Sequence, residues 1–171
     1  TNNDSFADKL RMYANHGALK KHFHKIEGIN SRMDGIQASI LSVKLKYIDK
    51  WTELRFENAK LYDELLSKIS QIARPLTHHN ASHVYHLYVI RAKYRDELAA
   101  YLKENNISTG IHYPNPLPYL DAYSYLKYKS KDFPVAYSQK NELLSLPMYP
   151  ELSKDEIKFV TDMIKNFYLN Q

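Results

Sequence analysis

A short polar loop near the start of the chain holds the first residues that could bind a ligand. Gly28 and Asn30 lie at its turn, and Arg32 follows just before a long apolar helix pattern. An amide can donate to a phosphate oxygen, a guanidinium can add a bidentate charged contact, and the free N–H groups of a helix start favour an anion. The loop is therefore a candidate phosphate site. The alternative is an asparagine turn with a helix cap, in which Arg32 pairs with Asp34 or Glu27.

His112 and Tyr113 form a second candidate site. They end an apolar segment that begins at Ile107 and has the pattern of a strand, and Pro114 opens a proline-rich loop directly after them. The end of a strand aims a side chain while the adjoining loop leaves it open to solvent. Neutral histidine can donate to or accept from a sugar hydroxyl or a diphosphate, and tyrosine can stack or hydrogen-bond. The pair is a candidate substrate site, and the alternative is an ordinary turn histidine.

Other catalytic patterns are absent from the sequence. The eight histidines could suggest a metal, but His83 and His86 fall on opposite faces of a predicted strand, and no carboxylate lies at a zinc-site spacing. The chain has no cysteine and only four glycines, which excludes thiolate sites and glycine-rich nucleotide loops. We therefore expect no metal site.

The composition indicates a globular protein. The 171 residues are 44% hydrophobic, and no apolar run approaches the ~20 residues of a membrane span. The net charge is +5, but the lysines are spread through the predicted helices and form no dense basic block. We expect a soluble protein with neither nucleic acid nor a membrane as its partner.

The apolar residues between Ile36 and Ile72 predict one long helix. They recur mostly at steps of three and four, and no glycine or proline interrupts them before Pro75. A helix over Met33–Ala73 would be about 60 Å long. Such an apolar face is longer than a chain of this size can cover, so the helix either breaks or packs against something outside the chain.

The remaining segments predict an α/β fold with an α+β C-terminal unit. Asp4 or Ser5 can cap a first helix that runs to about Asn15, and Gly17 is placed to end it. The segment from Ala18 to Ile29 has the character of a loop or irregular turn. After Pro75, strands and helices alternate in the order His83–Arg91, Tyr94–Asn105, Ile107–His112, Pro134–Glu142 and Leu143–Met148. A last helix begins at the capping box Ser153–Glu156, and its apolar residues lie on one face, at Ile157, Val160, Ile164 and Phe167.

Six motifs follow one another along essentially the whole chain. They are His16-Gly17, Gly28-x-Asn30-x-Arg32-Met33-Asp34 with Gln37-Ala38, His86 through Ile90-Arg91, Gly110-Ile111-His112-Tyr113-Pro114, Phe133-Pro134-x-Ala136, and Leu144-Ser145-Leu146-Pro147-x-Tyr149-Pro150. In this combination the chain resembles the DegT/StrS-type family of pyridoxal-phosphate (PLP) sugar aminotransferases. It departs from many family members at Ser31, where they have tyrosine, so an aromatic contact from that position is lost.

The resemblance implies that the chain is the C-terminal portion of a fold-type I PLP-dependent transferase. Residues 1–32 would be the end of the large-domain region and an interface loop, and residues 33–74 a long connecting helix. Residues 75–171 would form a small α+β domain, a small sheet with flanking helices. The resemblance also implies a cytoplasmic homodimer with its active sites at the subunit interface.

The function implied by the resemblance is transfer of an amino group, usually from glutamate, to a nucleotide-linked keto sugar. Surface polysaccharide or antibiotic sugar synthesis would fit. The residue matching Asn30 reaches the cofactor phosphate of the partner subunit, and Arg32 borders the same cofactor region. The residues matching His112 and Tyr113 lie near the nucleotide sugar, with His16 bordering that site.

The family's Schiff-base lysine motif has no counterpart here, and the chain opens at Thr1 without methionine. We therefore expect a fragment that holds no catalytic residue and is inactive alone. Because some family members carry histidine at the lysine position and act as dehydratases, a sugar dehydratase using PLP or pyridoxamine phosphate (PMP) stays open. The remaining alternative is a non-catalytic helical interaction module, which explains the length and charge but not the ordered motifs.

Overall fold

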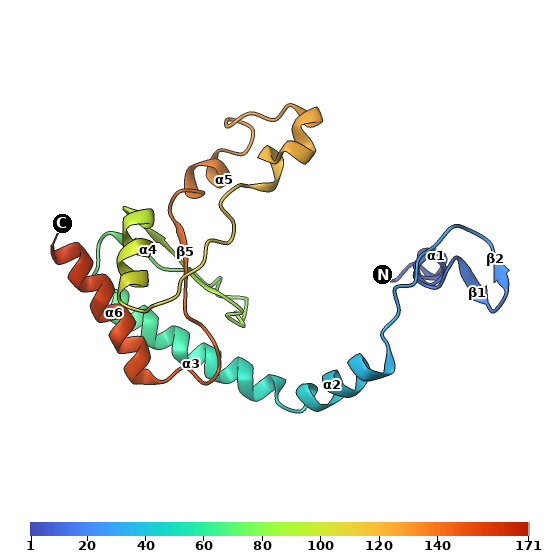
Figure 1. Ribbon diagram of the computed structural model, residues 1–171, viewed down its shortest axis with the longest axis horizontal. Coiled ribbons are helices and arrows are strands. Elements are labelled where there is room, and N and C mark those ends of the chain that lie inside the picture. Colours follow the sequence, from blue (N-terminus) through green and yellow to red (C-terminus); the bar gives the residue numbers. More distant parts are fainter. Residues whose placement is uncertain (171) are drawn as a thin grey trace. The chain divides into compact units, whose positions relative to one another are not determined.

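The computed structural model describes residues 1–170 and divides into two compact units, Thr1–Ile48 and Asp49–Gln171 (Figure 1). Both units combine helices with small antiparallel sheets, so the mixed α/β class expected from the sequence is confirmed. Among residues 1–170, no helix combines the length and apolar character that crossing a membrane requires.

The N-terminal unit contains two helices and a short hairpin, which are α1 (Asp4–Ala14), β1 (Ala18–Lys20), β2 (Phe23–His24) and α2 (Gly35–Leu45). α1 begins one residue earlier than expected, since the Asn3 side chain accepts a hydrogen bond from Phe6 N–H at 2.9 Å. α2 begins at a capping box, in which Asp34 Oδ1 accepts from Gln37 N–H at 2.8 Å. The hairpin lies in a segment that we expected to be a loop.

The helix expected over Met33–Ala73 is not continuous, so the break considered above as one of two outcomes is the one observed. α2 ends at Leu45, and a separate helix, α3, covers Ile48–Leu66. At the junction, Lys46 and Tyr47 donate their N–H groups to carbonyls three residues back, at 3.3 and 3.0 Å. These tighter hydrogen bonds replace the α-helical spacing and interrupt the ladder. The predicted division of the chain into an interface region (1–32), a connecting segment (33–74) and a small domain (75–171) remains a prediction.

A three-stranded antiparallel sheet of order β3-β4-β5 forms the centre of the C-terminal unit. β4 pairs with both neighbours, and its register with β5 runs from Tyr88 opposite Leu146 to Arg91 opposite Leu143. The elements after α3 are β3 (Ile72–Ala73), β4 (Tyr88–Ala92), α4 (Arg95–Glu104), the 3-10 turns η1 (Leu117–Tyr119) and η2 (Asp121–Leu126), α5 (Pro134–Gln139), β5 (Leu143–Leu146) and α6 (Lys154–Leu169).

All three predicted strands are shorter than expected, and β5 ends at Leu146 rather than at Met148. The strand expected from His83 begins only at Tyr88, because Tyr85 has a φ of 46° and left-handed backbone interrupts an extended strand. The strand expected over Ile107–His112 is reduced to one bridge between Gly110 and Ser145. Among residues 1–170, β5 therefore has a bridging neighbour on its second side only at Ser145.

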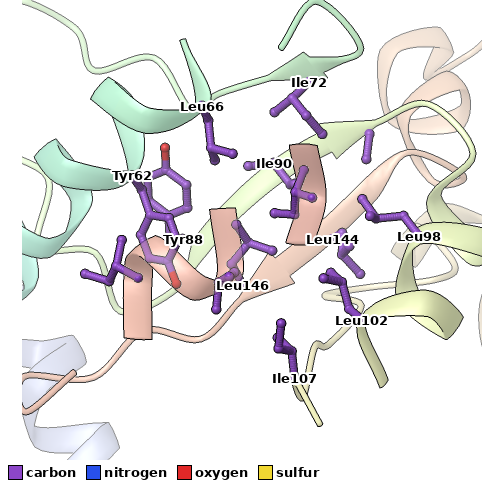
Figure 2. Close-up of a cluster of buried hydrophobic side chains, with 14 of the residues drawn as sticks. Tyr62, Leu66, Ile72, Tyr88, Ile90, Leu98, Leu102, Ile107, Leu144 and Leu146 are labelled. Atoms are coloured by element: carbon purple, nitrogen blue, oxygen red, sulfur yellow. The ribbon is translucent and has the colours of Figure 1, made fainter. Parts of the chain in front are cut away.

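One apolar cluster holds the C-terminal unit together, and Figure 2 shows part of it. α6 begins at the predicted capping box of Ser153 and Glu156 and buries the apolar face predicted for it. The cluster joins α3, the sheet, α4 and α6, and its largest fully buried aliphatic side chains are Leu66, Ile90, Leu98, Leu102, Leu144, Ile157 and Ile164.

Two buried tyrosines lie between α3 and β4. The rings of Tyr62 and Tyr88 stack with their centroids 4.8 Å apart, and both labels can be followed in Figure 2. Tyr62 Oη donates to Pro147 O at 3.0 Å, and Tyr88 Oη donates to Asp63 Oδ1 at 2.6 Å. Burial raises the pKa of Tyr88, and its hydrogen bond to the Asp63 carboxylate raises that pKa further. Both phenols are therefore hydrogen-bonded, as buried polar groups need to be.

Candidate functional site

The Asn30 loop, residues Gly28–Arg32, is tied to the end of α1 by the backbone. Asn30 pairs antiparallel with Asn15, so the neighbouring residue His16 also lies beside the loop. The hydrogen bonds run from Ile29 N–H to Tyr13 O at 2.8 Å, from His16 N–H to Ile29 O at 2.9 Å and from Ser31 N–H to Ala14 O at 2.9 Å. His16 and Asn30 are thereby brought together.

Two glycines permit this close approach. A Cβ on Gly28 would lie 2.3 Å from Gly17 N and 2.7 Å from Tyr13 O, and both contacts are with backbone. Gly17 has a φ of 80°, and a Cβ there would lie 1.6 Å from Ile26 O. The sequence suggested that Gly17 ends a helix and Gly28 forms a turn. The structure adds that neither position has room for a side chain.

Asn30 and Arg32 form one exposed polar pair. Arg32 Nε–H donates to Asn30 Oδ1 at 3.2 Å, while Asp34 is occupied in capping α2. Arg32 is thus paired with Asn30, and not with Asp34 or Glu27 as in the alternative considered above. Within residues 1–170, the Asn30 amide N–H groups and the terminal nitrogens of Arg32 have no hydrogen-bond partner. The pair therefore presents several donors to an oxygen-rich ligand.

The backbone of His16 is fixed, whereas its ring is exposed. Its φ is 54°, and its carbonyl accepts a hydrogen bond from His24 Nδ1 at 2.7 Å. This His24 contact was not anticipated from the sequence, because nothing in its spacing indicates a partner across the hairpin. A hollow of about 640 Å³ lies beside Arg32, lined also by Ser31, Met33, Gln37, Ile40 and Leu41.

The second candidate site lies in the C-terminal unit, where His112 follows the bridge to β5. The His112 Nδ1 atom lies 2.9 Å from Ser145 Oγ. The Tyr113 ring stands edge-on to the imidazole, with centroids 5.6 Å apart and an interplanar angle of 82°. Tyr113 is 73% exposed, so its phenol is open to a ligand. Sequence reasoning missed Ser145, whose only signal was its place in the motif Leu144–Pro147.

An apolar hollow of about 510 Å³ adjoins Tyr113. Its walls include Pro114, Leu117, Leu120 and Ala136, and Lys140 contributes an ammonium group that lies 4.4 Å from the Tyr137 ring centroid. The structure therefore groups His16, Asn30 and Arg32 in one unit, and His112 and Tyr113 in the other. No group of metal-ligating side chains suited to an ion occurs among residues 1–170.

Residues 1–165 match the profile of the DegT/DnrJ/EryC1/StrS aminotransferase family. The chain therefore belongs to this family. It is 42% identical over 170 residues to a Geobacillus stearothermophilus protein named pleiotropic regulatory protein, covering 98% of this chain and 46% of that one. It is also 37% identical over 167 residues to dTDP-3-amino-3,6-dideoxy-α-D-galactopyranose transaminase of Aneurinibacillus thermoaerophilus. This match covers 98% of this chain and 45% of the transaminase.

Solved structures agree with this assignment. The crystal structure of S. venezuelae DesV is 33% identical and superposes with a TM-score of 0.91, covering 98% of this chain and 45% of that one. Spr1654 of Streptococcus pneumoniae, a putative sugar aminotransferase solved in a PLP-form and a PMP-form, shares the fold at 22% and 21% identity with TM-scores of 0.84 and 0.85. The chain spans about half the length of the relatives that it matches.

Proposed function

We propose that this chain is the C-terminal part of a PLP-dependent aminotransferase that acts on a nucleotide-linked keto sugar, with glutamate as the amino donor. The observation that carries the proposal is family membership over residues 1–165, together with 37% identity to a protein named as a dTDP-sugar transaminase. When bound, PLP supplies the electron sink through which an amino group moves between an amino acid and a carbonyl compound. The Schiff-base lysine would lie outside this chain.

The Asn30 loop fits the phosphate group of this cofactor. Asn30 offers two amide N–H donors, and Arg32 both orients that amide through its Nε–H and adds positive charge. The backbone bonds to α1 fix the loop, so the donors are held in place before a ligand binds. Asp34, the nearest carboxylate in sequence, is engaged at the start of α2 and does not neutralise Arg32. In the homodimer, this loop would contact the cofactor of the partner subunit.

His112 and Tyr113 would hold the substrate, and the substrate role of His16 stays a prediction. An imidazole and a phenol at the end of a bridged segment can hydrogen-bond the diphosphate or sugar hydroxyls, while the apolar hollow beside Tyr113 accommodates a flat ring. The exposed apolar side chains of α2, among them Ile36, Ile40 and Val43, would pack against the remainder of the protein. Leaving such side chains in water costs about 1.5–3 kcal/mol each relative to full burial. We place this enzyme in the cytoplasm.

Substitution of Asn30 tests the cofactor role. In the full-length protein, Asn30→Ala should weaken PLP retention by roughly 10- to 100-fold, since it removes a hydrogen bond to a charged group worth about 1.5–3 kcal/mol. Asn166→Ala, an exposed asparagine on α6, is the matched control. PLP affinity is followed by absorbance during dialysis and reloading. Equal retention by the two variants would show that Asn30 is only a turn residue.

A further inference from the structure

Ser145 is a buried polar residue with a fixed position. It is 4% exposed and lies on β5, where its backbone N–H donates to Gly110 O at 2.7 Å and its carbonyl accepts from Gly110 N–H at 3.1 Å. Both backbone groups are therefore satisfied without the side chain. The hydroxyl has one hydrogen bond among residues 1–170, with His112 Nδ1 at 2.9 Å.

Because the Ser145 hydroxyl has this one hydrogen bond, we can infer which of the two groups donates the proton. A buried hydroxyl that leaves its O–H without an acceptor is costly, and His112 Nδ1 is the one hydrogen-bond partner of this hydroxyl in the part of the chain that the structure describes. Ser145 Oγ–H therefore donates to Nδ1, which must then be unprotonated. In a neutral imidazole, the proton is consequently on Nε2. Because the residue is exposed, Nε2–H is the polar group that His112 has left for a ligand.

Gly110 restrains the ring from a second side. A Cβ at this position would lie 2.7 Å from His112 Cε1 and 3.4 Å from Nδ1. The imidazole therefore packs directly on the Gly110 backbone, in space that any other residue would fill. Ser145 and Gly110 pair with each other, so one backbone bridge carries both restraints on the ring.

We propose that Ser145 and Gly110 are positioning residues that hold His112 as the Nε2–H tautomer, with that N–H presented to a ligand oxygen. Taking the ligand to be the diphosphate of the substrate rests on the function proposed above, whereas the tautomer does not. Neither residue touches the substrate in this account. Their effect is to raise the fraction of His112 rings that carry the proton on Nε2 and can donate it in a hydrogen bond to the ligand.

Nitrogen NMR of the ligand-free, full-length protein tests the tautomer. With ¹⁵N-labelled histidine, His112 should show a protonated Nε2 and an unprotonated Nδ1. Ser145→Ala and Gly110→Ala should each mix the two tautomers, the first by removing the donor and the second by displacing the ring. Thr161→Val is the matched control, because Thr161 is also a buried hydroxyl but donates to Lys158 O at 2.9 Å. A protonated Nδ1, or an unchanged tautomer in both variants, would overturn the proposal.

Binding of dTDP, measured by calorimetry on the same variants, separates this proposal from the proposed function. If the competent fraction of His112 falls to about a tenth, the dissociation constant for dTDP rises about tenfold in both Ser145→Ala and Gly110→Ala. Thr161→Val should bind as the unmodified protein does. Unchanged dTDP binding in His112→Ala, together with mixed tautomers in Ser145→Ala, would remove the substrate role of His112 and leave the positioning intact.

Discussion

Alanine in place of Gly28 should push the Asn30 loop away from α1. The new Cβ would lie 2.3 Å from Gly17 N and 2.7 Å from Tyr13 O, and backbone atoms cannot rotate aside. The loop must move outward, and the hydrogen bonds most directly strained are those that link Ile29 with Tyr13 and with His16, at 2.8 and 2.9 Å. The substitution therefore acts on the position of Asn30 without changing any side chain that would bind the cofactor.

The size of the effect follows from these two bonds. Each is worth about 0.5–1.5 kcal/mol net, so their loss removes about 1–3 kcal/mol that holds the loop in place. If PLP binds only while the loop is hydrogen-bonded to α1, the PLP affinity of the full-length protein should fall, by up to about fivefold for a loss of about 1 kcal/mol and up to about 150-fold for about 3 kcal/mol. Hydrogen exchange of the Ser31 and His16 amides should quicken, because both are bonded in the bridge.

Gly35 provides a matched control for Gly28. A Cβ on Gly35 meets nothing within 4 Å, and the residue is the first of α2. Gly35→Ala should leave PLP affinity unchanged and stabilise the helix by up to about 1 kcal/mol. If Gly28→Ala matches Gly35→Ala in both amide exchange and PLP affinity, the close approach of the two backbones does not hold the loop.

Three further predictions concern the core and its phenols. Tyr88→Phe removes the 2.6 Å bond to Asp63 and should lower the free energy of unfolding in urea by about 1–3 kcal/mol, whereas the exposed Tyr123→Phe should not change it. Leu144→Ala should cost about 2–5 kcal/mol, since Leu144 is 0% exposed in the apolar cluster; a loss below 1 kcal/mol would argue against this packing. Burial raises the pKa of Tyr168 to about 12, above the ~10 of an unfolded phenol. The native state therefore keeps a proton that the unfolded state releases, so stability should fall as pH rises from about 10 to about 12. Tyr168→Phe should flatten that fall, and an unchanged slope would refute the assignment.

The sequence correctly predicted the helix ends that are determined by residues close by in the chain. The apolar period and capping box of α6 were sufficient to predict its start and its buried face, and Gly17 correctly marked the region where α1 ends. The pairing of Arg32 with Asn30 was not predicted, because several partners lie equally near in sequence. Ser145 was missed as a partner of His112, since the two are 33 residues apart and meet only when Gly110 bridges to β5.

Backbone geometry explains the remaining errors. The junction at Lys46 and Tyr47 contains no glycine or proline, so the apolar period in the sequence showed no sign of the break. The break is made by hydrogen bonds to carbonyls three residues back instead of four. The left-handed conformations of His16 and Tyr85 could not be predicted from the sequence either, because non-glycine residues adopt them only when the surrounding fold imposes them. Such positions depend on contacts distant in sequence.

The most direct test of the central claim is transfer of nitrogen to a sugar. The full-length protein, loaded with PLP, is incubated with ¹⁵N-glutamate and a panel of dTDP- and UDP-linked keto sugars, the nucleotides that appear in the names of its relatives. We predict a nucleotide-linked amino sugar carrying ¹⁵N, detected by mass spectrometry, with 2-oxoglutarate formed in equal amount. Loss of water from the sugar without incorporation of ¹⁵N would identify a dehydratase instead. No reaction with any sugar of the panel, by a protein that retains PLP, would contradict the account.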